Sequence, residues 1–332
     1  MMKKRVIKFS LWAFIFAILV ACGDQDQVED VEVTADPEQA AIAEDDDQVE
    51  ETLTEVTYLG ERYPVDGLAE NLIITGSMEA MEDALLLGIE PTGAITVGGE
   101  FPDLYQSITT NAEAIGEKQQ PNVETILQLD PDLILSTAKF PEDVATDLDK
   151  VTTTIPVSHI ASNWQENLKL LAEITGKTSE ADSILENYDQ DLENVKANIV
   201  DKLNEEVIVM VRIRNGNIMI YPEDVYFNDL LYGDLGLEAP EVVQAAEAQE
   251  VISLEMFSDL NPDYLFVQME ESENQDQPDV IEELENNPIW QSIEAVKNDR
   301  VYLNTVDPLL EGGTAYSRIT FLDVINEKII GN

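Results

Sequence analysis

The chain has 332 residues, of which 68 are Asp or Glu, 18 are Lys or Arg, one is His and one is Cys, and 44% of the residues are hydrophobic. This length suggests two domains of ordinary size, and the hydrophobic content is enough to build a core. A formal net charge of −50 argues against a nucleic acid as partner, because such binding depends on cations that neutralise phosphates. One Cys and one His exclude an intramolecular disulfide, a thiolate metal cluster and a His-rich zinc site, so we expect no metal site.

The N-terminus has the pattern of an export signal. Four bases among residues 3–8 precede an apolar stretch at 9–20, which is too short for an ordinary membrane span. The sequence LVACG at 19–23 resembles the lipobox of bacterial lipoproteins, which implies that residues 1–21 are a signal peptide and that Cys22 is diacylated. We expect residues 22–56 to be the acylated Cys and a disordered acidic tether, because 23–55 carry 14 acids and no Lys or Arg.

The rest of the chain is also acidic. Residues 56–332 hold 54 acids and 14 bases, a net charge of −40. One explanation is a bacterial host in brine or alkaline medium, where self-repulsion keeps a secreted protein soluble. The other explanation is an acidic surface that serves a cationic ligand.

Beyond the tether, short β-rich runs alternate with helical patterns, which predicts a parallel α/β architecture. Residues 181–203 keep apolar residues at helical spacing without Pro or Gly, so we expect one long connecting helix there. The predicted domains are an N-terminal α/β lobe at 57–165, a helical linker at 166–204 and a C-terminal α/β lobe at 205–332. The strands expected before the linker lie at 72–74, 91–97, 133–136 and 156–160.

An internal repeat supports two lobes. The sequence VETILQLDPDLIL at 123–135 has a counterpart in LEMFSDLNPDYLF at 254–266, at a constant offset of 131 residues. Each copy predicts a short helix, an Asp/Asn-Pro-Asp turn and a buried strand. Two copies on either side of a long helix predict two Rossmann-like lobes with a ligand cleft between them. The alternative is a chance match between two helix-turn-strand units.

Several further motifs carry a family resemblance. They are PNVE at 121–124, LDPDLI at 129–134, VRIR at 211–214, YPEDV at 221–225, LYGDLGL at 231–237, NPIW at 287–290 and DPLLEGGTAYS at 307–317. Together with the lipobox and the repeat, they resemble the substrate-binding lipoproteins of bacterial ABC importers for ferric siderophores and cobalamin. The resemblance implies a class III periplasmic-binding-protein fold and a monomer held by its lipid at the outer face of a Gram-positive cell membrane. The implied partners are a ferric siderophore and an ABC permease dimer.

The resemblance favours a hydroxamate or citrate-hydroxamate as the siderophore, with another iron chelate or cobalamin as the alternative. The iron would be held by the siderophore, so no cofactor is expected. An enzyme is not expected, because the sole His accompanies neither a Gly-x-Ser-x-Gly elbow nor a catalytic Cys, and no phosphate loop is present. A hydrolase or a passive acidic cell-wall lipoprotein is the alternative from a different class.

Two arginines are the leading ligand-binding candidates. Alternation along the strand that begins at 208 places Arg212 and Arg214 on one face near its carboxyl end, where open α/β sheets bind ligands. Their planar donor groups suit carboxylates and other anionic oxygens. The alternative is that they bridge to local acids such as Glu223 or Asp224.

Weaker candidates surround this pair, each with an ordinary structural alternative such as surface exposure, helix capping or packing. They are Tyr221, Lys139, Tyr316, Arg318, Met78, Gly98, Phe101 and Trp164. The family often has a base where this chain has Glu100 and a Trp where it has Tyr316, so a family role at these two positions is in doubt. His159 is interpreted as a core residue.

The resemblance also implies that Glu124 and Glu255 dock onto the permease. They occupy equivalent places in the two repeats, each in the first turn of a short predicted helix. The alternative is that each merely stabilises its own helix through the helix dipole.

Overall fold

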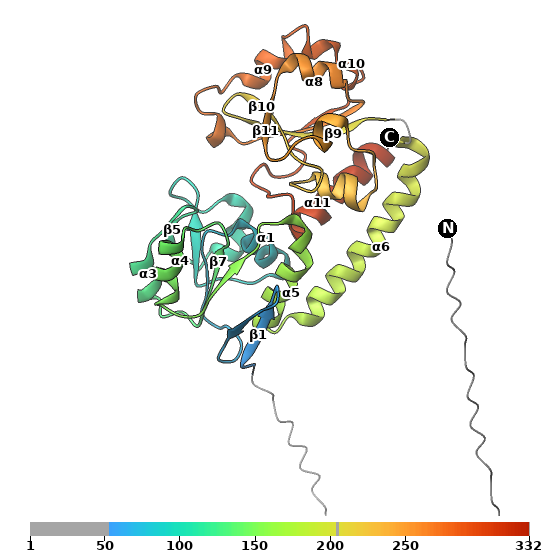
Figure 1. The fold of residues 1–332 in the computed structure, drawn as a ribbon. Helices are drawn as coiled ribbons and strands as arrows, with labels where there is room; N and C mark the ends of the chain where they lie inside the picture. Colours follow the sequence, from blue (N-terminus) through green and yellow to red (C-terminus); the bar gives the residue numbers. More distant parts are fainter. Residues whose placement is uncertain (1–52, 204–205, 332) are drawn as a thin grey trace, which may run out of the picture. The chain divides into compact units, whose positions relative to one another are not determined.

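A computed structural model describes residues 53–203 and 206–331, which fall within one compact unit. The signal peptide, Cys22 and nearly all of the predicted tether lie outside these residues. The described part forms two α/β lobes joined by one long helix, α6 (Thr178–Leu203), as Figure 1 shows. This is the architecture that the sequence predicts.

The N-terminal lobe contains a six-stranded sheet in the order β6-β5-β4-β3-β7-β8, which is parallel except for the β5–β6 hairpin. A small antiparallel pair, β1 and β2, precedes it. The strands are β1 (Glu55–Tyr58), β2 (Glu61–Pro64), β3 (Leu72–Ile74), β4 (Gly93–Thr96), β5 (Glu113–Glu117), β6 (Gln120–Pro121), β7 (Leu133–Thr137) and β8 (Thr154–Val157). The α-helices are α1 (Met78–Leu87), α2 (Gln106–Thr109), α3 (Val123–Gln128), α4 (Glu142–Asp149) and α5 (Trp164–Ile174), with 3₁₀ turns η1 (Asp103–Tyr105) and η2 (Ala161–Asn163).

The C-terminal lobe contains a five-stranded sheet in the order β11-β10-β9-β12-β13. Strands β9, β12 and β13 are parallel, while β10 and β11 run antiparallel at one edge. The strands are β9 (Ile208–Arg214), β10 (Asn217–Ile220), β11 (Glu250–Ile252), β12 (Tyr264–Met269) and β13 (Val301–Leu303). The α-helices are α7 (Glu241–Gln244), α8 (Leu254–Leu260), α9 (Val280–Glu285), α10 (Glu294–Lys297) and α11 (Ala315–Ile325). The 3₁₀ turns are η4 (Glu271–Asn274) and η5 (Trp290–Ser292), and the π-helical segments are η3 (Asp229–Asp234) and η6 (Asn326–Ile330).

The repeat in the sequence corresponds to a repeat in the structure. Residues 123–135 form α3 and β7, and residues 254–266 form α8 and β12. Both helices begin with a side-chain cap, because Asn122 accepts a hydrogen bond from the Thr125 amide and Ser253 accepts one from the Met256 amide. Each short helix therefore starts at the residue before the repeated Glu.

The core shows how the arginine strand is oriented. Ile208 and Met210 of β9 pack into a hydrophobic cluster that both lobes share, while Val209 and Val211 pack into a second cluster on the other face of the sheet. Period-two alternation therefore continues the shared-core face into Arg212, toward the other lobe. The hairpin that follows is confirmed, because Asn215 and Gly216 both have positive φ angles (49° and 70°) between β9 and β10.

Two predicted boundaries need correction. Val56 is buried in β1, so the ordered fold begins inside the segment expected to be tether. Helix α5 starts at Trp164 and packs against α1 and β1, so it is part of the N-terminal lobe and not of a linker. The connection between the lobes is α6, which packs against α5 at one end and against α11 and η6 at the other. Among the described residues, no helix has both the length and the apolar character needed to cross a membrane.

Candidate functional site

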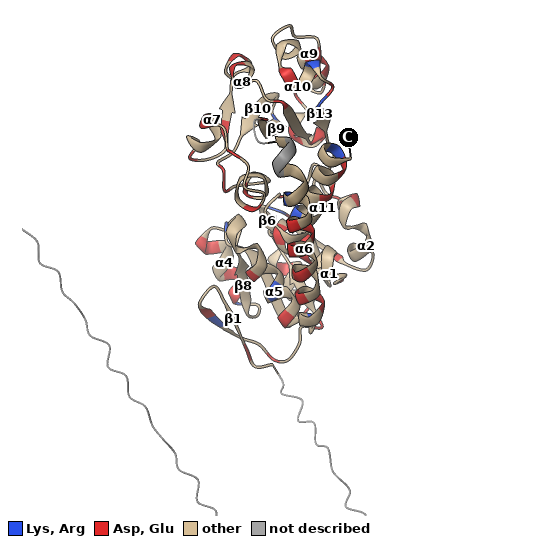
Figure 2. Cartoon of the chain, turned by 90° about the vertical axis from the view of Figure 1, so that its right-hand side faces the viewer, with Lys and Arg blue, Asp and Glu red and all other residues tan. Residues whose placement is uncertain are grey.

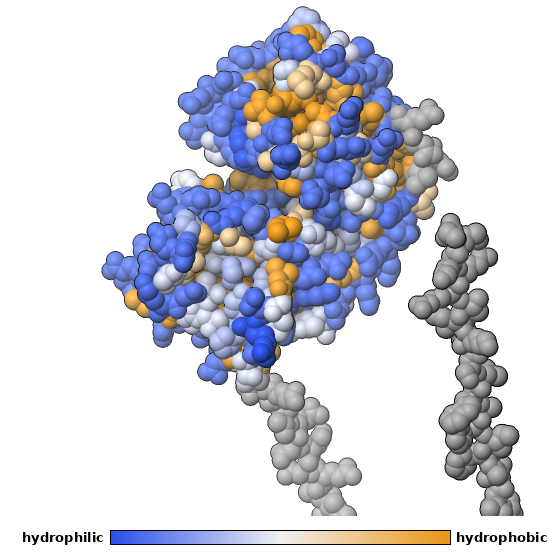
Figure 3. Space-filling model, in the orientation of Figure 1, coloured by the Kyte–Doolittle hydropathy of each residue, from blue (hydrophilic) through white to orange (hydrophobic). Residues whose placement is uncertain are grey.

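A cavity of about 700 Å³ lies between the two lobes. In the N-terminal lobe its walls are loops at the carboxyl ends of β4, β5, β7 and β8, which is the edge where open α/β sheets bind ligands. In the C-terminal lobe they are the end of β9 and the loops after β10, β12 and β13. Figure 3 shows the hollow between the lobes. Its volume is in the range of about 300–1,000 Å³ that is typical of small-molecule sites.

Four cationic side chains line this cavity: Lys118, Lys139, Arg212 and Arg214. Lys118 lies in the turn between β5 and β6, Lys139 follows β7, and the arginines end β9. Residues 56–332 contain only 14 bases, and Figure 2 shows acidic residues over both lobes and along α6. The cavity gathers four of the scarce cations, so an anionic ligand can bind there where it replaces the acids that also line it, which are Glu79, Asp224, Glu270, Glu273 and Glu311.

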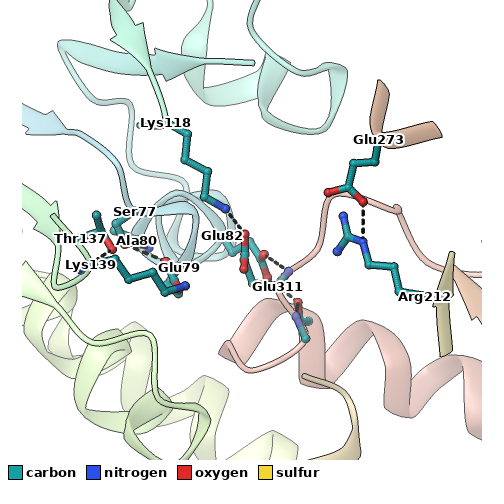
Figure 4. Close-up of polar contacts among 12 residues, drawn as sticks. Ser77, Glu79, Ala80, Glu82, Lys118, Thr137, Lys139, Arg212, Glu273 and Glu311 are labelled. Carbon is teal, nitrogen blue, oxygen red and sulfur yellow. Dashed lines mark hydrogen bonds and ion pairs between the residues drawn. The ribbon is translucent and has the colours of Figure 1, made fainter. Parts of the chain in front are cut away.

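Three carboxylates pair with these cations (Figure 4). Glu79, in the first turn of α1, lies 3.4 Å from Lys139 Nζ. Glu273 accepts hydrogen bonds from Arg212 Nε at 2.9 Å and from Arg214 at 2.6 Å. Glu311, on the loop before α11, forms an ion pair with Lys118. The arginines are therefore bridged by an acid, but the acid is Glu273 and neither Glu223 nor Asp224.

Aromatic rings support Arg212. Its guanidinium lies 5.9 Å from the ring centre of Tyr226, and Tyr226 stacks on Tyr221 with ring centres 4.6 Å apart. Both tyrosines line the cavity, so the expectation for Tyr221 agrees with its position. Arg214 has a second partner, because it donates a hydrogen bond to the Gln249 side chain at 3.0 Å. The arginine pair is thus held in place before any ligand binds.

The ion pairs set the protonation of the acids. Burial alone would raise the pKa of Glu273, but hydrogen bonds from Arg214 and the charge of Arg212 outweigh it and lower the pKa. Burial would likewise raise the pKa of Glu311, and the ion pair with Lys118 lowers it. The pKa of Glu79 is raised, because burial and the nearby Glu311 charge outweigh the effect of Lys139.

One residue of this site, His159, was misplaced, and the sequence did not predict six others, which are Lys118, Glu273, Glu311, Glu79, Tyr226 and Gln249. Lys118, Glu273 and Glu311 lie in loops that show no periodicity, although the scarcity of bases could have singled out Lys118. His159 was expected in the core, but it is exposed and lines the cavity in the loop after β8. Burial and the charge of Lys139 lower the pKa of His159.

Five predicted contacts do not line the cavity, whereas Met78 and Lys139 do. Gly98 is exposed and its amide donates a hydrogen bond to Glu117. Phe101 and Tyr316 pack against the shared core instead. Trp164 is buried, with its ring edge on Tyr188 at a centroid distance of 5.1 Å. Packing therefore accounts for Phe101, Tyr316 and Trp164, whereas Gly98 lies at the surface. The fifth residue is Arg318.

Arg318 is the clearest correction. Its side chain is fully buried, and its guanidinium forms ion pairs with Asp229 and Asp234 of η3 and lies 5.1 Å from the Trp164 ring centre. Helix α11 turns this side chain away from the cavity and into the core. Arg318 therefore has no path to a ligand, and its role is structural.

The two glutamates of the repeat are exposed. Glu124 lies in α3 and Glu255 in α8, one on each lobe. Each helix also exposes a large apolar side chain, since Leu127 is 59% and Met256 is 58% exposed. The two acids are at equivalent places in the repeat, but the apolar residues beside them are not, because Leu127 corresponds to Ser258 and Met256 to Thr125.

Within residues 53–203 and 206–331, no group of three or more His, Cys, Asp or Glu side chains is arranged to hold a metal ion. The cavity itself offers ammonium, guanidinium, hydroxyl and amide donors beside its carboxylates. These groups can bind the anionic surface of a ligand whose iron is already coordinated.

The sequence profile of the periplasmic binding protein family matches residues 73–307. The chain therefore belongs to this family, and the class and fold inferred from the sequence are confirmed. A curated relative is the iron-uptake system-binding protein of Bacillus subtilis, which is 52% identical over 277 residues, covering 83% of this chain and 87% of the relative. Another is a probable siderophore-binding lipoprotein of Bacillus subtilis, 24% identical over 91% of this chain and 90% of its own length.

A solved structure shares the fold at high identity. The triscatecholate siderophore-binding protein FeuA of Bacillus subtilis, complexed with ferri-bacillibactin, superposes with a TM-score of 0.79 at 52% identity, covering 84% of this chain and 98% of that one. Staphylococcus aureus SirA superposes with a TM-score of 0.70 over 83% of this chain and 98% of its own, at 22% identity, which shows the common fold. These relatives are binding proteins.

Proposed function

We propose that this protein captures a ferric siderophore of the triscatecholate type outside the cell and delivers it to an ABC permease for iron uptake. The observation that carries the proposal is the set of four cations around a cavity of about 700 Å³ in a strongly acidic chain. The relative at 52% identity is a triscatecholate binder. The sequence favoured a hydroxamate or citrate-hydroxamate, and this preference is replaced.

Ligand charge favours the triscatecholate over a trihydroxamate, and the ligand of the relative at 52% identity favours it over the anionic citrate-hydroxamates. Three catecholates around Fe(III) make a trianion, whereas three hydroxamates make an uncharged complex. A trianion gains from Lys118, Lys139, Arg212 and Arg214, because close opposite charges attract by several kcal/mol at an intermediate dielectric. The uncharged complex would leave these cations without that gain. The siderophore supplies all the iron ligands, so the protein needs no cofactor of its own.

A fluorescence titration tests the proposal. The ligands are a ferric triscatecholate, a ferric trihydroxamate, ferric citrate and cobalamin, added to the protein without its signal peptide. We expect the triscatecholate to bind most tightly, and Lys118→Gln to weaken it at least about tenfold. Lys150→Gln is the matched control, because this exposed lysine pairs with Asp147 on α4 and does not line the cavity. The proposal would be contradicted if the trihydroxamate bound more tightly than the triscatecholate. It would also be contradicted if Lys118→Gln and Lys150→Gln lost equal affinity for the triscatecholate.

The same proposal includes the anchor and the partner. A diacylated Cys22 would hold the protein on the outer face of the membrane, since two acyl chains give a stable hold and one does not. Glu124 and Glu255 would dock onto a permease dimer, one from each lobe, supported by their exposure and by the exposed Leu127 and Met256 beside them. The protein would act as a monomer and not as an enzyme.

A further inference from the structure

Glu311 occupies an unusual place in the cavity. It belongs to the C-terminal lobe and pairs with Lys118 of the N-terminal lobe, so among the described ion pairs it bridges the two lobes. The other cavity acids that form ion pairs do so within their own lobe, Glu79 with Lys139 and Glu273 with the arginines. Figure 4 shows Lys118 reaching Glu311 between these two groups.

Glu311 interacts electrostatically with three of the four cavity cations. Burial opposes its ionisation, but Lys118, then Lys139 and then Arg212 each lower its pKa. These cations come from both lobes, so the carboxylate lies between them. A negatively charged group at this point stands where the anionic oxygens of a ligand would stand.

The loop that carries Glu311 is rigid. The Glu311 amide donates a hydrogen bond to Glu82 Oε1 at 2.7 Å, and the buried Glu82 also accepts hydrogen bonds from the Thr314 and Ser317 hydroxyls. The next residue, Gly312, has a φ of 79°, and a Cβ there would lie 2.7 Å from the Tyr226 backbone. Hydrogen bonds therefore hold the backbone of Glu311, and the ion pair with Lys118 holds its carboxylate in the cavity.

We propose that Glu311 is a resident counter-anion that competes with the ligand for Lys118 and so sets the affinity and release rate for highly charged ligands. This inference rests on the proposed function and adds a residue that opposes binding. In the empty cavity Glu311 pairs with the charge of Lys118, and this ion pair links the two lobes. When an anionic ligand enters, Glu311 loses its share of Lys118 and repels the ligand in proportion to the ligand's charge.

Glu311→Gln tests the inference, because it removes the charge and keeps both the size and the amide hydrogen bond to Glu82. We expect it to tighten a ferric triscatecholate by about tenfold, mainly through slower dissociation in stopped flow, and to change an uncharged ferric trihydroxamate by less than about twofold. Asp224→Asn is the matched control, since Asp224 lines the cavity without an ion pair to a described cation. Removing the charge of Asp224 should increase the affinity for the triscatecholate much less than Glu311→Gln does.

Three results would overturn the inference. Glu311→Gln could bind the triscatecholate no more tightly than the wild type, or Asp224→Asn could increase the affinity as much as Glu311→Gln does. The third result is that Glu311→Gln increases the affinity for the uncharged ligand as much as for the triscatecholate. A purely structural role would lower the unfolding temperature and weaken both ligands alike. If Glu311→Gln folds poorly, Glu311→Ala keeps the same amide hydrogen bond and should show the same dependence on ligand charge. Failure of the wild-type protein to bind any of the ferric complexes would instead refute the proposed function.

Discussion

Replacing Arg318 separates a structural cation from a ligand-binding one. The side chain is fully buried and its guanidinium pairs with Asp229 and Asp234, whose side chains are 22% and 27% exposed. Tyr188 donates a hydrogen bond to Asp234 at 2.5 Å, so the cluster joins α6, η3 and α11. We expect Arg318→Met to destabilise the fold and to leave the affinity for the ligand unchanged.

The magnitude follows from burial. Removing one partner of a buried ion pair costs about 3–5 kcal/mol, because it leaves an uncompensated charge. Here the carboxylates that remain are partly exposed and water can solvate them, so we expect the lower part of this range, about 3–4 kcal/mol. For a protein of this size each kcal/mol lowers the unfolding temperature by about 2–4 °C, which gives a decrease of about 6–16 °C.

Calorimetry measures the unfolding temperature, and a ligand titration on the same preparation measures the affinity. Asp234→Asn is the control within the cluster, because Arg318 keeps Asp229 as a partner and the loss of stability should be about half as large. The reasoning is refuted if Arg318→Met weakens ligand binding tenfold while its unfolding temperature stays at the wild-type value. Such a result would mean that Arg318 contacts the ligand.

Three further predictions concern protonation, docking and anchoring. Burial raises the pKa of Glu82 from 4.5 to about 8, so its stabilising effect is complete below pH 4.5 and is lost as the pH rises through 8. Denaturant titrations should show the unfolding free energy falling by up to about 1.4 kcal/mol per pH unit in this window, and an unchanged slope in Glu82→Gln would contradict this. Glu124→Arg combined with Glu255→Arg should leave ligand affinity and unfolding temperature nearly unchanged and abolish uptake in cells, whereas normal uptake would exclude the docking assignment. Cys22→Ser should release the protein into the medium, and retention in the membrane fraction would contradict the lipid anchor.

Sequence patterns predicted the elements whose periodicity is local. Alternation along 208–214 placed Arg212 on the face that turns toward the other lobe, and the repeat at 123–135 and 254–266 located two equivalent helix-strand units. Both inferences use only neighbouring residues and the strand or helix period. They required no knowledge of how distant segments pack.

The rest of the site depends on packing between distant segments. Whether Arg318 faces a ligand or the core depends on where Asp229 and Asp234 lie, about 85–90 residues earlier in the chain. Lys118 enters the site because β5 and β6 form a short hairpin at the sheet edge, and Glu311 meets it from the other lobe. Neither position carries a periodic signal, so the sequence did not indicate that the two would pair.

The junction between the lobes predicts a small motion on binding. Besides α6, the lobes meet where α1 packs on α11, and Glu82 of α1 accepts hydrogen bonds from the Thr314 and Ser317 hydroxyls. A buried acid of one lobe thus accepts hydrogen bonds from the first turn of a helix in the other. Lobe opening would expose this joint and the shared hydrophobic cluster, at a large cost in free energy.

We therefore expect ligand to enter a largely preformed cleft. Small-angle scattering with and without a ferric triscatecholate should show the radius of gyration changing by less than about 1 Å, as in other preorganised complexes. Glu82→Ala provides the contrast, because it removes the acceptor that three donors share and should loosen the joint, so that its ligand-free form becomes larger than the wild type. A contraction of several ångströms in the wild-type protein would mean that the α1–α11 joint opens and that the lobes move as separate bodies.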